Sequence, residues 1–457
     1  MLNPSFAWSR ARRKRGRARS PELFSTDFVC SRCSVACMIA RCRILDRYRR
    51  VAFLECDPGQ SEFTPAGMVA LNIVERPVFG EGGHFLLALS VRMLTALYSG
   101  PPFSHPSIPN SAHYIGATSP RSSPSHYLAA VQELIRFYRL DVQTPVDMLE
   151  TSDSSDRRVT DVIPLVVNTM GWNKGLGADL ALRIQEIAEP TDVFDIESPV
   201  IDPSWLVPYV SPPRLQEGRE VSAQYGGSRL HALQPISTTV QMAIFSPADF
   251  RNLSILSYFH ALFPLDIVPE LRQVSAVSWN IALPLCAQPP YEVDWNMAVE
   301  KVVLIGAGME DVVPSEIERV LNGALVGLVS CEPGSLDEDT SMEVESRIPY
   351  TQGLSAPSPS TSVCRGLALV RALSPTSSHM HMVTPVPPHV LADGRVLVKG
   401  ELELPIWGLL DFRNEGGEMT TKGVDLQKAP FLRWGKNEGI GTERRRIRRN
   451  LMRKGQM

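Results

Sequence analysis

The sequence predicts an α/β domain with a parallel sheet, followed by a smaller domain that is rich in β-strands. Short apolar runs at 51–54 and 163–167 stand next to helical segments, and this rhythm is typical of parallel strands joined by helices. Past Leu265 the apolar runs are separated by turns instead, as in a domain built mostly of strands. We expect a first domain at 28–268 and a second at 269–457.

The expected elements of the first domain follow one another in a simple order. A helix over 39–50 precedes the strand 51–54, and a polar loop covers 148–161. The strand 163–167 leads through a glycine-rich turn into a helix over 178–187. Beyond a long excursion rich in Pro, Gly and Ser at 198–235, a further helix spans 247–262.

The second domain is predicted from four short apolar runs between turns. They lie at 302–305, 324–329, 366–370 and 396–398. A segment near 333–361, rich in Ser, Pro and acidic residues, interrupts them. That composition indicates a disordered insert.

Length and composition place the chain among ordinary globular proteins. It has 457 residues, 44% hydrophobic and 21% charged, and wholesale disorder is excluded by that balance. The apolar runs, such as 85–89, fall far short of the roughly 18 residues that cross a bilayer. We therefore expect no membrane span and no membrane partner.

Positive charge is concentrated near the two ends of the chain. The net charge is only −3, yet residues 1–50 hold thirteen Lys and Arg against three acids, and the bias returns at 444–449. Basic ends favour a nuclear address or contact with phosphates. We expect residues 1–27 to be a disordered basic arm and the protein to be nuclear or nucleolar. An Arg-rich transit peptide is the alternative. The charges at 12–15 are clustered, however, whereas in a transit peptide they would be spread along one face of a helix.

Cysteines gather in the N-terminal region. Five of the eight fall within 27 residues, at positions 30, 33, 37, 42 and 56. A zinc site would need a second ligand pair after a longer loop, and none follows. Free thiols in a reducing compartment are the favoured interpretation.

The first candidate site follows the strand 51–54. Glu55 and Asp57 come directly before the sharp turn Pro58-Gly59, and Gln60 comes after it. Ligands of open α/β sheets bind at the carboxyl ends of the strands. A carboxylate there can hold Mg²⁺ or accept a proton from an attacking hydroxyl, as in phosphoryl transfer. An ordinary Asp-Pro-Gly turn is the alternative.

The second candidate site follows the strand 163–167. Gly171 permits close approach of a ligand to the backbone, Lys174 offers a cation, and Trp172 offers a flat surface on which a base could stack. A tryptophan that is simply part of the core is the alternative. The Gly-Leu-Gly at 175–177 does not complete a dinucleotide-binding motif. Two such loops on neighbouring strand ends would face one cleft.

Seven blocks of the sequence, taken together, resemble one family. They include VAFLECDPGQSEFTPAG, HYIGATSPRSSPSHY and PLVVNTMGWNKGLGADL, and they lie at 51–67, 113–127, 164–180, 251–260, 321–329, 395–407 and 433–453. In this order they resemble the polynucleotide 5′-hydroxyl kinases, in the nucleolar branch that processes ribosomal RNA. That branch is sister to the kinase subunit of the pre-mRNA cleavage machinery.

The resemblance implies a fold, a reaction and a partner. The fold would be a P-loop-NTPase-like parallel sheet flanked by helices. The reaction would be ATP-dependent phosphorylation of the 5′-hydroxyl of pre-ribosomal RNA, with Mg²⁺, during spacer removal in the nucleolus. The partner would be a HEPN-type rRNA-processing endonuclease, and the basic tail, with Trp434, would dock to it or be a plain solvated end.

The resemblance also implies roles for the first candidate site. Asp57 would bind the metal and activate or orient the RNA 5′-hydroxyl, while Gln60 would position phosphates, metal or water. Glu55 would contribute to cofactor binding, next to the ligands of Mg²⁺. Arg251 falls in the region that resembles the lid, whose arginines stabilise the transferred phosphoryl group.

The second candidate site would bind the RNA end. Thr169, Gly171 and Trp172 match the family's clasp, in which the tryptophan stacks on the terminal base, and Lys174 would add a contact to RNA. Thr118 and Arg121 belong to a matched block, but the resemblance gives them no role.

One family element has no match in this sequence. The Walker A loop, G-x-x-x-x-G-K-[ST], would fall at 32–35, where only Ser34 fits as a cofactor-binding residue. No glycine occurs from 17 to 58, so the backbone cannot approach phosphates as closely as this loop must. The family's N-terminal domain is also without a counterpart. We therefore expect this chain to bind ATP poorly.

Two explanations for the unmatched loop stay open. An error in the gene start or a splice junction could have replaced it, or the chain is a degenerate member that has lost catalysis. In the second case it would be a scaffold that binds and stabilises the endonuclease and RNA. A nucleotide-binding protein unrelated to RNA is a third alternative.

Overall fold

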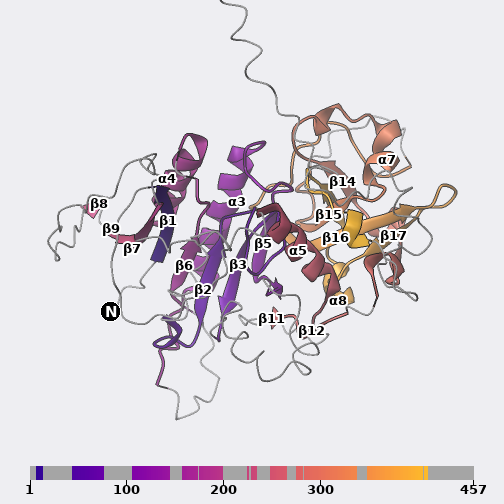
Figure 1. The fold of residues 1–457 in the computed structure, drawn as a ribbon. Coiled ribbons are helices and arrows are strands. Elements are labelled where there is room, and N and C mark those ends of the chain that lie inside the picture. The colour runs from indigo at the N-terminus through magenta and orange to yellow at the C-terminus, as the bar shows by residue number, and fades with distance from the viewer. Residues whose placement is uncertain are drawn as a thin grey trace, which may run out of the picture. The chain divides into compact units, whose positions relative to one another are not determined.

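The computed structural model describes a large part of the chain (Figure 1). The described residues are 7–13, 44–76, 105–144, 157–172, 174–198, 224–225, 228–233, 247–264, 274–280, 283–336, 347–404 and 406–409. They fall into two compact units, one of 1–280 with 290–404 and one of 281–289 with 405–457. Within the second unit the described elements are the short 3-10 helices η5 (Leu285–Ala287) and η8 (Ile406–Leu409).

An eight-stranded sheet belongs to the first unit. Its order is β5-β3-β2-β6-β1-β7-β9-β8. The strands are β1 (Ala7–Arg13), β2 (Val51–Glu55), β3 (Met68–Val74), β5 (Ser111–Tyr114), β6 (Leu165–Asn168), β7 (Asp192–Ser198), β8 (Gln224–Tyr225) and β9 (Ser228–Leu233). The five neighbours β2, β6, β1, β7 and β9 are parallel. The predicted α/β fold with a parallel sheet is thereby confirmed.

The helices of eight or more residues that the structure describes all lie in the first unit. They are α3 (Pro124–Phe137), continued by the π-helical turn η2 (Tyr138–Val142), α4 (Leu176–Ala188) and α5 (Pro247–His260). Proline at the first turn of α3 is well placed, because that position needs no hydrogen-bond donor. Tyr127, Val131 and Leu134 bury one face of α3 at helical spacing.

The central strands are buried on both faces, which explains their continuous apolar character. Alternate residues such as Leu54 and Val167 share a core with α3 and α4. The intervening residues, such as Phe53 and Val166, pack on the other face with Phe63. Every residue of β2 and β6 is buried as a result.

A six-stranded sheet follows in the same unit. Its order is β13-β17-β16-β15-β18-β14. The strands are β13 (Tyr291–Asp294), β14 (Lys301–Leu304), β15 (Leu325–Cys331), β16 (Ser362–Leu373), β17 (His379–Val383) and β18 (Val396–Lys399). Neighbours are antiparallel except β14 and β18. The core of this sheet includes the buried Trp295. The indole N–H of Trp295 donates to the Arg347 carbonyl at 3.0 Å.

Smaller elements complete the description. The short helices are α6 (Trp295–Ala298), α7 (Ile317–Leu321), α8 (Pro388–Leu391), η6 (Met309–Asp311) and η7 (Pro314–Glu316). Two-residue strands pair as β4 (Ser107–Ile108) with β11 (Val274–Ser275) and β10 (Ala261–Leu262) with β12 (Ser278–Trp279). No described helix is long and apolar enough to cross a membrane.

The structure differs from the predicted disordered arm at 1–27. Residues 7–13 form β1, which pairs with β6 on one side and β7 on the other. The sequence Ala-Trp-Ser-Arg-Ala-Arg-Arg has no strand-like apolar pattern, so the position of β1 follows from backbone hydrogen bonding to two neighbours. Residues 14–27 lie outside the described residues.

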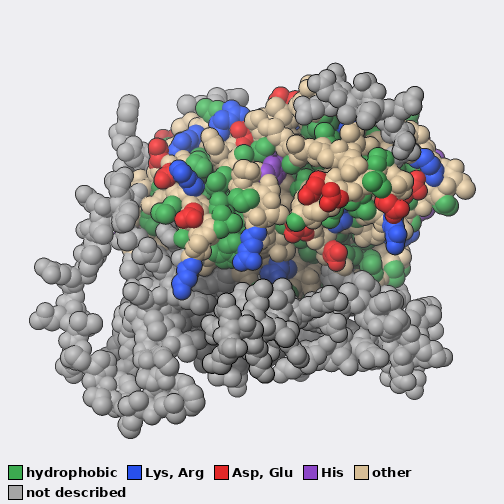
Figure 2. Space-filling view, turned by 90° about the horizontal axis from the view of Figure 1, so that it is seen from above, with side chains coloured by type: hydrophobic (Ala, Val, Ile, Leu, Met, Phe, Trp, Pro, Cys, Tyr) green, Lys and Arg blue, Asp and Glu red, His purple; other side chains and the backbone are tan. Residues whose placement is uncertain are grey.

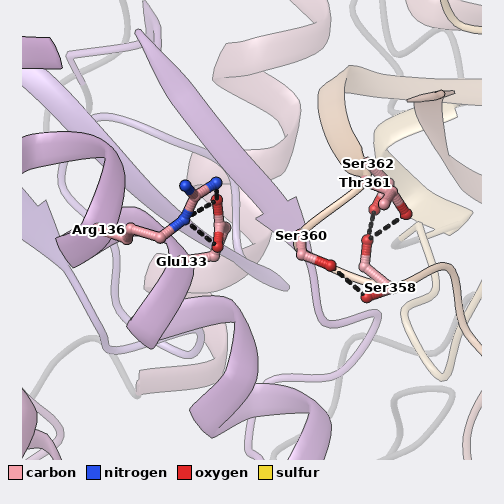
Figure 3. A network of polar contacts seen from close by, with 6 residues as sticks. All are labelled: Glu133, Arg136, Ser358, Ser360, Thr361 and Ser362. Carbon is pink, nitrogen blue, oxygen red and sulfur yellow. Dashed lines mark hydrogen bonds and ion pairs between the residues drawn. The ribbon is translucent and has the colours of Figure 1, made fainter. Parts of the chain in front are cut away.

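The predicted disordered insert at 333–361 is also partly wrong. Ile348 and Tyr350 are buried in the core of the six-stranded sheet. Figure 3 shows the turn before β16, where the Ser362 hydroxyl donates to the Ser358 carbonyl at 2.6 Å. This ordering depends on long-range packing, which a polar composition does not reveal. The compact units also differ from the predicted division at 268/269.

Several other expectations meet the described residues only in part. Of the helix predicted at 39–50, residues 44 and 45 are helical and turns follow. Within the predicted excursion at 198–235, β8 and β9 form an antiparallel pair at the edge of the sheet. The cysteines at 30–42 lie outside the described residues, and the described ones, at 56, 286, 331 and 364, are free thiols.

Candidate active site

Three loops leave the eight-stranded sheet at the same edge. β2 and β6 are parallel neighbours with Glu55 opposite Asn168, and the Cys56 N–H donates to the Asn168 carbonyl at 2.8 Å. β5 is antiparallel to β3, which is antiparallel to β2, so β5 runs in the direction of β2. Each of these strands is followed by a loop. We call them the Asp57 loop (56–61, after β2), the Arg121 loop (115–123, after β5) and the Trp172 loop (169–175, after β6). The strands before the two candidate sites are thus parallel neighbours, and that their loops face one cleft stays a prediction.

The Asp57 loop is packed tightly against its neighbours. A methyl group on Gly59 would lie 2.7 Å from the Thr118 carbonyl oxygen, so this contact between loops requires glycine. The Tyr127 hydroxyl of α3 donates to the Cys56 carbonyl at 2.6 Å. The loop is therefore held from the Arg121 loop and from α3.

Asp57 lies half-buried at the centre of this arrangement. Its Oδ1 accepts hydrogen bonds from the backbone N–H groups of Gly59 at 2.8 Å and Gln60 at 3.2 Å. Burial raises the pKa of the Asp57 carboxyl, while those two hydrogen bonds and the charge of Arg251 act in the opposite direction. Arg251 of α5 thus lies within electrostatic range of Asp57, as two residues of one site should. A carboxylate with a raised pKa is suited to accept a proton.

Glu55 has a different environment, deep under the loop. It is fully buried, and its Oε1 accepts the backbone N–H of Glu62. Its Oε2 accepts the N–H of Phe63 at 3.3 Å and the Thr64 hydroxyl at 3.4 Å. These contacts give Glu55 a structural role in holding the chain after the Asp57 loop. Its role in cofactor binding stays a prediction.

We expect Glu55→Gln to lower the free energy of unfolding by about 1–3 kcal/mol, because the new amide NH₂ would face N–H donors and leave a buried group unpaired. Urea denaturation measures the change. Glu186→Gln on α4 is the matched control, since Glu186 is 64% exposed and pairs with Arg183, which is exposed too. Equal unfolding midpoints for the two variants would contradict this role of Glu55.

The Trp172 loop combines buried and exposed side chains. Thr169 is buried, whereas Gly171 and Lys174 are exposed. Trp172 is half-buried and packs against the main core, where Gly177 of α4 leaves room for its Cβ and ring. The alternative that this tryptophan is a core residue is therefore partly correct. The guanidinium carbon of Arg121 lies over the indole ring, 4.8 Å from its centre.

The remaining predicted residues are only partly placed. Gln60 is half-buried, and its backbone, as described above, binds Asp57. Ser34, predicted to bind the cofactor, lies outside the described residues, as does the basic tail after 409. Reasoning from the sequence missed Arg121 as a neighbour of Trp172. The one signal for it was its place in the matched block 113–127.

The fold and the site define a class of protein. The family described as mRNA cleavage and polyadenylation factor CLP1 P-loop matches residues 34–202, and the chain has a P-loop-NTPase-like fold. The polynucleotide 5′-hydroxyl-kinase GRC3 of Cryptococcus neoformans var. neoformans serotype D (strain B-3501A) is 35% identical over 435 residues, which cover 90% of this chain and 53% of the relative. The chain belongs to the polynucleotide 5′-hydroxyl-kinase family.

More distant matches extend the comparison. The polynucleotide 5′-hydroxyl-kinase grc3 of Schizosaccharomyces pombe is 26% identical over 433 residues, covering 90% of this chain and 51% of the relative. The chain thus spans about half the length of the curated relatives it matches. A chain in the solved structure of the Clp1p–Pcf11p complex is similar with 13% identity and a TM-score of 0.47, over 88% of this chain and 76% of that chain.

Proposed function

We propose that this chain transfers the γ-phosphoryl group of ATP to the 5′-hydroxyl of RNA. The observation that supports this best is Asp57, a carboxylate with a raised pKa at the edge where three loops meet, within electrostatic range of Arg251. Phosphoryl transfer relies mainly on positioning and on charge stabilisation. The relatives named as polynucleotide 5′-hydroxyl kinases support the same reaction.

Each residue of the site has a part in this proposal. Asp57 orients the RNA 5′-hydroxyl and accepts its proton, and Arg251 stabilises negative charge on the transferred group. Gln60 positions phosphates or water beside them. Thr169, Gly171, Trp172 and Lys174 hold the RNA end.

The Asp57 carboxylate also fits Mg²⁺. Among the residues that the structure describes, no group of three or more His, Cys, Asp or Glu side chains could hold a metal ion. Mg²⁺ is commonly held by one or two carboxylates together with substrate phosphates. The Oδ2 atom of Asp57 suits such a contact, because the hydrogen bonds from Gly59 and Gln60 both reach Oδ1.

The sequence fits ATP poorly where the phosphate-binding loop is expected, since no glycine occurs from 17 to 58. We expect isothermal titration of this chain with Mg·ATP to give binding much weaker than low-micromolar, because no glycine backbone can surround the phosphates closely. Low-micromolar affinity would contradict this expectation.

The setting of the reaction is part of the proposal. The basic residues near both ends and the resemblance to the nucleolar branch support action in the nucleolus, on pre-ribosomal RNA spacer ends that carry a 5′-hydroxyl. A HEPN-type endonuclease that leaves such ends is the expected partner. Substrates and partner are inferred from the family as a whole.

A second candidate function is favoured by the same lack of glycines. A chain without a phosphate-binding loop could serve as a scaffold that binds the endonuclease and RNA without catalysis. Incubation of the purified chain with γ-labelled ATP and a 5′-hydroxyl RNA oligonucleotide separates the two functions. Label transfer supports the kinase, whereas co-purification of the endonuclease without transfer supports the scaffold.

A further inference from the structure

Arg121 has no part in the function proposed above, yet it is in contact with Trp172. It is exposed, and its guanidinium carbon lies 4.8 Å from the centre of the indole ring. This distance is well within the range of cation–π attraction, about 6 Å. Since the ring packs against the core while Arg121 is exposed, the guanidinium forms the outer layer of the pair.

The loop that carries Arg121 is held firmly. Ile115 and Gly116 donate their N–H groups to the Gly67 carbonyl at 2.8 and 3.1 Å, and Leu402 donates to the Gly116 carbonyl at 3.0 Å. Thr118 packs against Gly59 of the Asp57 loop. Arg121 is therefore placed over Trp172 from a fixed backbone next to the Asp57 loop.

A second cation belongs to the same site, since Lys174 of the Trp172 loop is exposed as well. On the face shown in Figure 2, the described Lys and Arg side chains lie among hydrophobic and acidic ones. Of the two cations, Arg121 offers a flat surface in addition to its charge.

We propose that Arg121 and Trp172 form a two-layer platform for the 5′-terminal base of a single-stranded polynucleotide. Instead of stacking directly on Trp172, the base stacks on the outer plane of the guanidinium, as unpaired bases do on arginine, and the charge of Arg121 attracts the first phosphate. Arg121 is thus an RNA-binding residue and the group that covers the ring of Trp172. This inference rests on the proposed function, which supplies the polynucleotide.

Fluorescence anisotropy of a short 5′-hydroxyl RNA, labelled at its 3′ end, tests the platform without requiring ATP. We expect R121A to weaken binding by about 5- to 150-fold, the range of one stacked base. The dependence of log K on log salt should become shallower by about 0.7, the value for one contact to a single-strand phosphate. R121K should keep the salt dependence and still lose affinity, since it keeps the charge without the flat surface.

Arg183→Ala is the matched control for loss of one positive charge. Arg183 is 68% exposed on α4 and pairs with Glu186, so its loss should leave RNA affinity unchanged. R121A should weaken the binding of a single-stranded DNA of the same sequence by the same factor, because stacking does not involve the 2′-hydroxyl. The part of the tryptophan fluorescence that comes from Trp172, identified by its loss in W172F, should be quenched when RNA is added.

The outcomes distinguish this inference from the proposed function. If R121A binds RNA as tightly as the unsubstituted chain, the platform is overturned. If R121K binds RNA as tightly as the unsubstituted chain, the platform is also overturned, because the charge alone would then suffice. Tighter binding by R121A would instead make Arg121 a cap that the base displaces, which also overturns it. If the unsubstituted chain binds no RNA, the proposed function fails together with the platform.

Discussion

Replacing Asp57 by Asn is expected to lower the rate of label transfer from ATP to a 5′-hydroxyl RNA by about 100- to 10,000-fold, the usual contribution of a positioned proton acceptor. An amide cannot accept the proton and is a weaker ligand for Mg²⁺. The amide oxygen of Asn can still accept the N–H groups of Gly59 and Gln60, which Asp57 binds at 2.8 and 3.2 Å. The loop should therefore keep its conformation.

The measurement is the initial rate of transfer at saturating ATP, together with RNA affinity and urea stability. Asp141→Asn is the matched control, since Asp141 is exposed on η2 and belongs to none of the three loops. A D57N variant as active as the D141N variant would contradict the role of Asp57.

Stability is expected to decline as the pH falls from about 6.5 to about 4, by up to about 3 kcal/mol, because of His113. His113 is 4% exposed, and its Nε2 has no hydrogen-bond partner among the described residues. The pKa of His113 is lowered from 6.5 to about 4, chiefly by burial and to a lesser extent by nearby His126, while Glu133 acts in the opposite direction. Figure 3 shows Glu133 engaged with Arg136 of the same helix, at 2.9 Å.

The sign follows from which state takes up the proton first. In the unfolded chain the histidine is protonated near its ordinary pKa of 6.5, whereas the folded protein resists protonation until about pH 4. Between these values the unfolded state binds more protons, so stability is lost as the pH falls. Above the ordinary value the contribution is fully present.

Urea denaturation near neutral pH and at about pH 5 checks this expectation. His113→Gln, which does not titrate, should lose less stability between the two conditions than the unsubstituted protein, by about 2 kcal/mol. His389→Gln is the control, because His389 is exposed on α8. Equal pH dependence of the His113 variant and the unsubstituted protein would contradict a buried, neutral His113.

The sequence by itself determined the local structure around the site. The apolar runs at 51–54 and 163–167 became β2 and β6, and the predicted helices at 178–187 and 247–262 became α4 and α5. These predictions succeeded because periodicity and turn residues act over a few neighbouring positions. They also placed Asp57 directly after a buried strand, at an edge where ligands bind.

The tertiary structure alone decided which side chains meet. Arg251 acts on Asp57, Arg121 lies over Trp172, and Glu55 is engaged by the loop at 62–64. The first two relations depend on strand order and on the packing of elements far apart in the chain, whereas Glu55 is held by residues that follow it closely but only once the loop has folded back over it. For the same reason the basic segment 7–13 was taken for a disordered arm, although it pairs with strands on both sides. Composition describes a segment alone, whereas pairing depends on the neighbours that the fold brings to it.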